Sequence, residues 1–289
     1  AGSAAAAIFK RIDCALPRPS DWVDGPGGLK PDLRPWSEVE KEYGFAGDLA
    51  NLRPRVKGQG SLERFDYWLS TFRYMKATAR VRCLWAEHDK AMEKVAAEKD
   101  AKTRSAIARE AALPLREELV KAVAEVHARL LETVSNPGEL GTVANWQQHI
   151  LPGLLEKPAA ELEKALGEPL PASAMPSRRY EGPPRVIVPA VRTSLTAGEA
   201  LRVKAIILSG SPPREVALHW RPLGRGELTR VPLAHVSRGV YSVELKADAA
   251  AGEDLEYHVQ AVMQDGMTLY FPATAPGVSQ TVVVVPAVP

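Results

Sequence analysis

The chain has 289 residues, of which 45% are hydrophobic and 25% are charged, as in ordinary globular proteins long enough for two domains. Its 37 basic and 35 acidic residues leave a net charge of +2, and no segment has a one-sided basic excess. This balance argues against a nucleic-acid or anionic-membrane partner. No stretch approaches 18 consecutive apolar residues, so we expect no membrane span, and residues 1–7 lack the charged and apolar regions of a signal peptide.

Residues 1–60 are rich in proline and glycine, which interrupt regular secondary structure. Within this region, the stretch from Pro35 to about Leu52 is the one that could be helical. A mostly irregular run of this length is unusual inside a self-sufficient domain. We therefore expect residues 1–60 to wrap over the following domain or over a missing neighbour.

Residues 61–167 have apolar residues at the three-and-four spacing of helices with one buried stripe. Short connections between long amphipathic helices predict an antiparallel bundle. The expected helices run from about Leu62 to Lys99, from about Thr103 to Val134, over Glu139–Ile150 and over Lys157–Leu166.

Three breakers define the ends of these expected helices. Pro114 should kink the second helix, because proline lacks an N–H and its ring collides with the preceding turn. The Pro152-Gly153 pair should stop the third helix, and Gly167 should close the fourth.

Residues 168–184 hold five prolines and almost no apolar periodicity, so we expect a linker there. In residues 185–289 every second residue is apolar over short stretches, which predicts seven or eight short strands separated by Gly, Pro and Asp turns. This count and spacing are typical of an immunoglobulin-like or fibronectin-like β-sandwich. The predicted architecture is an α plus all-β multidomain chain, in which an antiparallel helical bundle precedes the sandwich.

The strand pattern predicts the positions of two aromatic residues in the sandwich. Trp220 shares the parity of Val216 and Leu218, so we expect it in the core. Tyr257 follows a turn early in a penultimate strand, which suits a tyrosine corner.

The histidines do not have the spacing of a metal site. His88 has no partner ligand one turn away, so it is expected at the surface. His219 and His258 should point outward from two paired strands, with His235 in a loop, but no cluster of Cys, Asp or Glu accompanies them. We expect no metal and no cofactor.

No nucleophile elbow, phosphate-binding glycine loop or zinc-protease motif is present in the sequence. Carboxylates suited to glycoside hydrolysis include Asp13, Asp21 and Asp66, but their separation in space decides that chemistry, and we expect solvated or capping acids. Cys14 and Cys83 could form one disulfide at most, and we favour free, partly buried thiols.

Aromatic residues gather on the first expected helix. Phe65 and Phe72 belong to its core stripe, whereas Tyr67, Trp68 and Tyr74 lie on other faces. A helix with apolar residues on several faces is expected to be buried on several sides, here by the second helix and by the segment with Trp22 and Trp36. The alternatives are a sugar-stacking platform or a lost domain interface. The candidate glycan-contact residues are Trp22, Trp36, Trp68 and Trp146.

Two parts of the sequence resemble regions of carbohydrate-active enzymes. The segments Val216–Arg221, Arg238–Val243 and Asp254–Val262, followed by Asp265-Gly266, resemble the immunoglobulin-like modules that end many large secreted bacterial carbohydrate-active enzymes. The segments Arg64–Leu69, Thr71–Tyr74, Leu131–Val134 and Gly141–His149 are similar to helical regions that follow the catalytic barrel in some glycoside hydrolases.

The resemblance implies a C-terminal accessory region without the catalytic barrel, secreted or periplasmic, whose partners are a catalytic domain or chain and polysaccharide. No catalytic residue of such enzymes matches a position in this sequence. The alternative hypothesis is a protein–protein interaction scaffold with no carbohydrate role. A third hypothesis is a glycoside hydrolase with its site near Trp22, Trp36 and Trp146.

Overall fold

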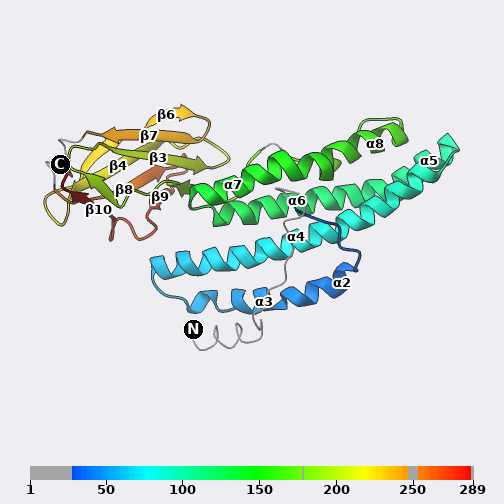
Figure 1. Cartoon of the computed structure of the whole chain (residues 1–289), viewed down its shortest axis with the longest axis horizontal. Helices are drawn as coiled ribbons and strands as arrows, with labels where there is room; N and C mark the ends of the chain where they lie inside the picture. Colours follow the sequence, from blue (N-terminus) through cyan, green and yellow to red (C-terminus); the bar gives the residue numbers. More distant parts are fainter. Residues whose placement is uncertain (1–27, 178, 247–252, 288–289) are drawn as a thin grey trace. The chain divides into compact units, whose positions relative to one another are not determined.

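The computed structural model describes residues 28–177, 179–246 and 253–287 (Figure 1). The chain divides into two compact units, Ala1–Thr133 with Leu140–Arg178, and Val134–Glu139 with Arg179–Pro289. Helices form the first unit, and two β-sheets form most of the second. Within the described parts of the chain, no helix is both long enough and apolar enough to cross a membrane.

The helical unit is built around one helix of 39 residues, α4. Helices α5, η3 and α6 follow one another almost without interruption, and α7 to α8 do the same. The elements are α2 (Trp36–Val39), η1 (Glu40–Tyr43), α3 (Gly44–Ala50), η2 (Arg53–Arg55), α4 (Gln59–Ala97), α5 (Ala101–Ile107), η3 (Ala108–Ala112), α6 (Leu113–Thr133), α7 (Pro137–Asn145), η4 (Trp146–Ile150), η5 (Pro152–Glu156), α8 (Lys157–Leu166) and η6 (Ala172–Ala174).

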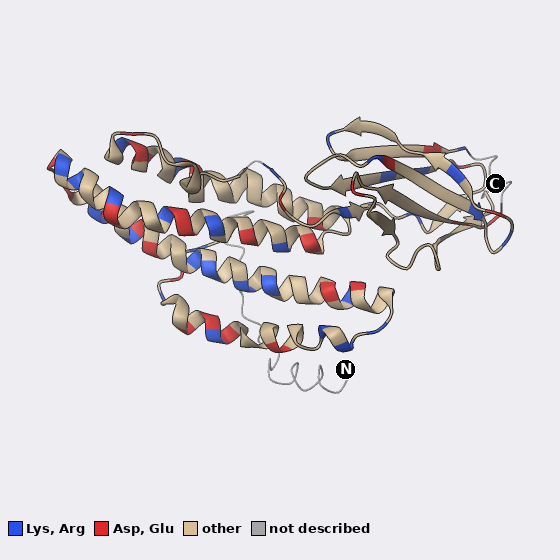
Figure 2. Cartoon of the chain, turned by 180° about the vertical axis from the view of Figure 1, so that it is seen from behind, with Lys and Arg blue, Asp and Glu red and all other residues tan. Residues whose placement is uncertain are grey.

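Helix α4 is buried on more than one side, as its aromatic content predicted. Val81 and Leu84 pack with Leu119 and Val123 of α6, which lies alongside α4 (Figure 1). Two further clusters cover other faces of α4, where residues of α2, η1 and α3 pack on Leu69, Phe72, Ala79 and Cys83. Figure 2 shows Lys and Arg interleaved with Asp and Glu along these helices.

Proline positions in this unit coincide with π-helical turns. The turns η3, η4 and η5 each end two residues before a proline, namely Pro114, Pro152 and Pro158. In a π turn the backbone hydrogen bond joins residues five apart instead of four. This wider turn relieves the clash between the proline ring and the carbonyl four residues earlier. The expectation that Pro152-Gly153 stops a helix is therefore wrong, because the chain stays helical from Pro137 to Leu166.

The ends of two helices follow the expected capping chemistry. Gly167 closes α8 with φ at 77°, a left-handed conformation that favours glycine, and its N–H donates to the carbonyl of Glu163. At the start of α7, the Asn136 side chain accepts from the backbone N–H of Glu139 at 3.1 Å. The Glu139 carboxylate accepts from the N–H of Asn136 in return, which completes a capping box.

The second unit contains two sheets. The four-stranded sheet has the order β1-β3-β7-β6, and the six-stranded sheet has the order β2-β10-β8-β4-β5, with β9 also paired to β8. All neighbours are antiparallel except β2 and β10. The strands are β1 (Arg185–Ile187), β2 (Ser194–Thr196), β3 (Leu201–Leu208), β4 (Glu215–Pro222), β5 (Thr229–Pro232), β6 (Ala234–Ser237), β7 (Val240–Leu245), β8 (Leu255–Val262), β9 (Thr268–Phe271) and β10 (Gln280–Val285).

The described residues form ten strands, more than the seven or eight expected, and β2 and β6 are only three and four residues long. His235, expected in a loop, lies on β6. The residues of β6 are all exposed, so this strand has no alternation of buried and exposed positions for a sequence pattern to detect.

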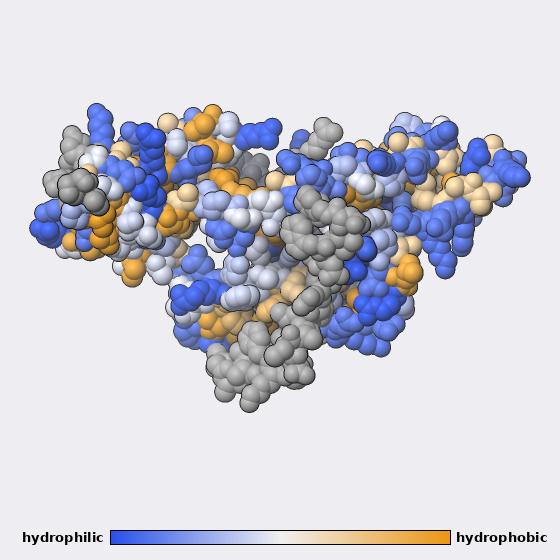
Figure 3. Space-filling view, in the orientation of Figure 1, coloured by the Kyte–Doolittle hydropathy of each residue, from blue (hydrophilic) through white to orange (hydrophobic). Residues whose placement is uncertain are grey.

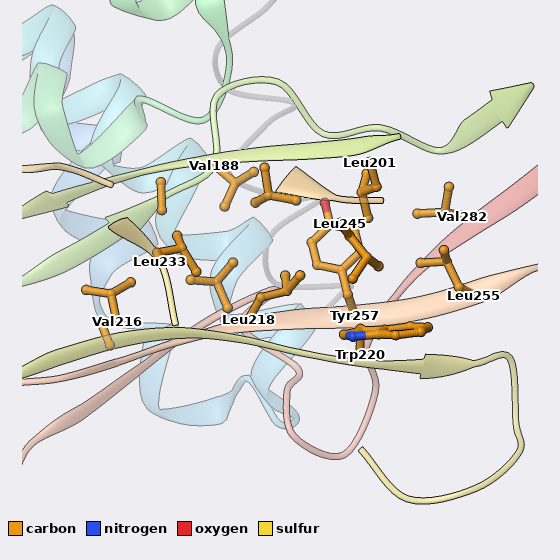
Figure 4. Packing of buried hydrophobic residues seen from close by; sticks show 14 of the residues in the cluster. Val188, Leu201, Val216, Leu218, Trp220, Leu233, Leu245, Leu255, Tyr257 and Val282 are labelled. Atoms are coloured by element: carbon orange, nitrogen blue, oxygen red, sulfur yellow. The ribbon is translucent and has the colours of Figure 1, made fainter. Parts of the chain in front are cut away.

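Residues from both sheets share one core (Figure 4). Trp220 is buried there as its parity predicted, and it lies opposite Tyr257 in the β4–β8 register. The tyrosine-corner assignment of Tyr257 is wrong: its ring points into the core, and among the described residues its hydroxyl has no hydrogen-bond partner. A tyrosine corner instead requires a hydrogen bond from that hydroxyl to the backbone.

Candidate functional site

Trp68 is the one exposed aromatic side chain in the described parts of the chain, with 54% of its surface accessible. It lies in the first third of α4, on the edge of the cluster formed with α3. Figure 3 shows apolar residues reaching the surface in small groups, one of them over α3. An exposed tryptophan with an apolar support is a feature of contact surfaces.

Aromatic contacts hold the Trp68 ring in place. It stacks on Phe72, one helical turn later, with ring centroids 6.2 Å apart, and Tyr67 meets it edge-on at 5.4 Å. Phe72 is buried and is itself fixed by an edge contact with Phe45 of α3. We call Phe45, Tyr67, Trp68 and Phe72 the Trp68 surface. Its exposed ring is supported by the core, so a partner would meet a preordered side chain.

Two carboxylates near Trp68, those of Asp66 and Glu132, are already paired. Arg53 of η2 binds Asp66 in a bidentate ion pair, with N···O distances of 2.6 and 2.7 Å. The Ser70 hydroxyl donates to Glu132 of α6 at 2.8 Å, and Arg129 donates to the same carboxylate. Asp66, considered from the sequence as a carboxylate for hydrolysis, thus ties η2 to α4.

Trp36, a second glycan-contact candidate, is half-buried and faces two cations. The guanidinium of Arg80 lies 5.5 Å from the ring centroid, and the ammonium of Lys76 lies 5.9 Å from it. These cation–π contacts occupy the ring and fasten α2 to α4. Trp36 packs with Val39, Tyr43, Ala79 and Cys83, whereas Trp68 stacks on Phe72, which belongs to a separate cluster.

Trp146 is only 1% exposed, so its prediction as a glycan-contact residue is wrong. Its indole N–H donates to the Tyr74 hydroxyl at 2.9 Å, and the ring meets His127 edge-on. Because Trp36 and Trp146 lie in different clusters, the structure does not bring them into one catalytic site. Trp22, Asp13, Asp21 and Cys14 lie outside the described residues.

His88 is completely buried, which contradicts its expected surface position. In the described structure neither ring nitrogen has a hydrogen-bond partner. Burial lowers the pKa of His88 to about 4, and the nearby Arg116 cation lowers it further in the same direction. The neutral imidazole is therefore the stable form at neutral pH. The spacing of Leu84, His88, Ala91 and Val95 is the signal that could have placed it in the core.

Arg116 is the buried cation beside His88, and it binds backbone oxygens. Its Nε donates to the carbonyl of Ala174 at 3.1 Å, and Nη1 donates to the carbonyl of Leu155 at 2.7 Å. Burial lowers the pKa of this guanidinium to about 10, an effect that Glu163 opposes. Arg116 thus fastens both η5 and η6 to α6, which is a structural role.

Cys83 is a free, buried cysteine packed among Val39, Tyr43 and Ala79. Burial raises the pKa of its thiol to about 11, and neighbouring Asp32 acts in the same direction. Thiolate is the reactive form of cysteine, so Cys83 is unsuited to nucleophilic chemistry.

His219 and His258 lie opposite each other on β4 and β8 and point outward, as predicted. Their rings stack with centroids 5.0 Å apart and planes within 6°. A metal ion needs ligand lone pairs that converge at about 2 Å, and the lone pairs of parallel stacked rings do not converge. Within the described ranges, no group of three or more His, Cys, Asp or Glu residues could hold a metal ion.

No protein-family model and no curated protein matches the chain. Twenty-two chains of solved structures do match. One is an engineered protein, 14% identical, for which the match covers 44% of this chain and 27% of that chain with a TM-score of 0.27. Another is murine CRIg, 12% identical, with coverage of 37% and 100% and a TM-score of 0.22. Scores this low carry no argument about fold or function.

Proposed function

We propose that the chain is a non-catalytic accessory region of a polysaccharide-acting enzyme, secreted or periplasmic, that contacts a catalytic domain or glycan through the Trp68 surface. The observation that carries the proposal is the exposed Trp68 ring, held by Phe72 and Tyr67. Fully burying a large apolar side chain is worth about 1.5–3 kcal/mol, so an exposed, preordered ring favours a bound state. The family assignment itself rests on the sequence resemblance.

Part of this proposal is that the second unit is an immunoglobulin-like module. Its strand orders β1-β3-β7-β6 and β10-β8-β4-β5 match the A-B-E-D and G-F-C-C′ sheets of such modules. Trp220 on β4 then occupies the place of the buried tryptophan of strand C. The domain scheme that goes with it is a wrapping segment (1–60), a helical bundle (61–167), a linker (168–184) and the module (185–289).

The test is binding of the full chain to a panel of soluble plant, algal and bacterial polysaccharides, measured by affinity electrophoresis and calorimetry. We expect retention on at least one polysaccharide, and Trp68→Ala should weaken it about tenfold or more, a loss typical of an aromatic hot spot. Val236→Ala, an exposed apolar position on β6, is the matched control. Release of reducing sugar by the chain would instead support a glycoside hydrolase.

A second candidate is a protein–protein interaction scaffold with no carbohydrate role. It is favoured by the pairing of Asp66 with Arg53 and of Glu132 with Ser70, because these groups would have to break existing bonds to bind sugar hydroxyls. Tryptophan and tyrosine are also the side chains that most often anchor protein interfaces. Failure to bind any polysaccharide, together with self-association that Trp68→Ala abolishes, would favour this candidate.

A further inference from the structure

On the side of β8 that faces away from β4, the pairing with neighbouring strands is interrupted at His258. Residues 259–262 of β8 pair with β9, and residues 255–257 pair with β10. Between the two pairings the chain leaves the sheet over Pro272–Ser279. This segment is closed by its own hydrogen bonds, from the N–H of Val278 to the carbonyl of Thr274 and from the Thr274 hydroxyl to the carbonyl of Val278.

The His258 side chain fills the interrupted position. It lies on the outer side of β8 and is nevertheless only 3% exposed, because His219, Tyr270 and Ser279 surround it. Its Nδ1 lies 3.1 Å from the Ser279 hydroxyl at the base of the Pro272–Ser279 segment. The imidazole of His258 therefore connects this segment to the sheet.

A hydrogen-bonded chain fixes the second imidazole of the stack. Gln260 donates through Nε2 to the Tyr270 hydroxyl at 3.2 Å, which leaves its Oε1 to accept from Nε2 of His219 at 3.0 Å. The two rings, on the neighbouring strands β4 and β8, thus stack with centroids 5.0 Å apart, and each ring has a hydrogen-bond partner.

The charged groups around the stack are paired with one another and do not contact the imidazole nitrogens. Glu256 binds Arg221 at 2.6 Å, and Glu215 of β4 binds Arg230 of β5, the cross-strand neighbour of His219. The remaining titratable side chain that faces the stack is Tyr270 of β9. Glu256 and Glu215 lie near enough to attract a charged imidazole, but each is already paired with an arginine, so neither carboxylate is left to neutralise a second proton on the pair.

We propose that the His219–His258 stack is an acid-sensitive latch, which holds the Pro272–Ser279 segment on the sheet when at most one ring is charged and releases it when both are. Each hydrogen bond tolerates protonation of its own ring, because Gln260 Oε1 and Ser279 Oγ can both accept. Two like charges 5.0 Å apart in a shielded site repel each other strongly. Burial and the neighbouring His219 both lower the pKa of His258, consistent with this coupling, whereas Glu256 opposes it.

The experiment is hydrogen–deuterium exchange on the full chain at pH 7.5 and pH 5.0, with rates corrected for intrinsic chemical exchange. We expect exchange in peptides covering 254–262 and 271–282 to accelerate about tenfold at the lower pH, while β3 and β7 change little. In His219→Phe an aromatic ring remains beside His258 without a charge, so the acceleration should fall to less than about twofold. His235→Gln on β6 is the control and should behave as the unmodified chain.

Equal acceleration in His219→Phe and in the unmodified chain, or no acceleration in either, would overturn the latch. If His219→Phe fails to fold, an NMR titration of the unmodified chain decides the question. The imidazole C–H signals of a coupled pair should titrate in two steps about one pH unit or more apart. A single midpoint shared by both rings would contradict the proposal.

Discussion

At the scale of single residues, the buried side chain of His88 makes the folding stability of the helical unit depend on pH. His88 lies in the stripe of α4 that packs on α6 and α8, and no hydrogen bond compensates its nitrogens within the described structure. Its pKa of about 4 in the folded chain lies below the ordinary value of 6.5. The unfolded chain therefore binds a proton more readily, and folding stability must fall as the pH drops through this interval.

We predict that His88→Leu removes a pH-dependent loss of stability of up to about 3 kcal/mol between pH 6.5 and pH 4. The sign follows from the lowered pKa: the stabilisation is complete above pH 6.5 and is lost as the pH falls towards 4. Urea unfolding followed by circular dichroism at several pH values measures it. His149→Leu, at an exposed position of η4, should keep the full pH dependence. A parallel response of both variants would contradict this assignment.

The sequence located Trp220 correctly because strand parity is a local property that burial on one side of a sheet must obey. It misplaced His88 and Trp146, because a polar or amphipathic residue on an apolar stripe can face the core or the solvent, and the neighbouring helix decides which. The exposure of Trp68 was equally undetermined, since the cluster with α3 takes up Phe65, Leu69 and Phe72 of α4 but does not include Trp68.

At the scale of secondary-structure elements, the π turns and Arg116 form one structural device. Prolines 114, 152 and 158 are accommodated by the widened turns η3, η4 and η5 that precede them, and the chain remains helical through each proline. Arg116 then binds the carbonyl of Leu155, within η5, and the carbonyl of Ala174, at η6. The sequence predicted the helices and their approximate ends, but a proline pattern alone does not distinguish a break from a π turn.

We predict that Arg116→Met destabilises the helical unit by roughly 2–4 kcal/mol, because two buried carbonyl oxygens lose their donor. Exchange of amides in 150–175 should accelerate more than exchange in α4. Arg109→Met is the matched control: Arg109 forms a surface ion pair with Glu168, and its loss should cost less than about 1 kcal/mol. Comparable unfolding free energies for the two variants would show that Arg116 is not a fastening residue.

At the scale of the whole molecule, the edges of the two sheets limit pairing with other chains. Strand β6 is short and carries a bulge between His235 and Ser237, and β5 ends in Pro232. Short edges, bulges and proline are the features that prevent strand addition. Contacts with a partner are therefore more easily made through side chains, which is consistent with the role proposed for Trp68.

The main hydrophobic cluster of the second unit takes its buried residues from Val188 to Val282, whereas Arg116 of the helical unit depends on Ala174 near that unit's end. We predict that residues 180–289 alone show a single cooperative thermal transition, because they contain the whole of this cluster. Residues 1–170 should melt at a lower temperature than residues 1–178, since the shorter fragment lacks Ala174 and leaves the Arg116 Nε without its acceptor. Differential scanning calorimetry of the three fragments and the full chain measures these transitions. Absence of a cooperative transition in 180–289, or equal melting of the two helical fragments, would contradict this division of the molecule.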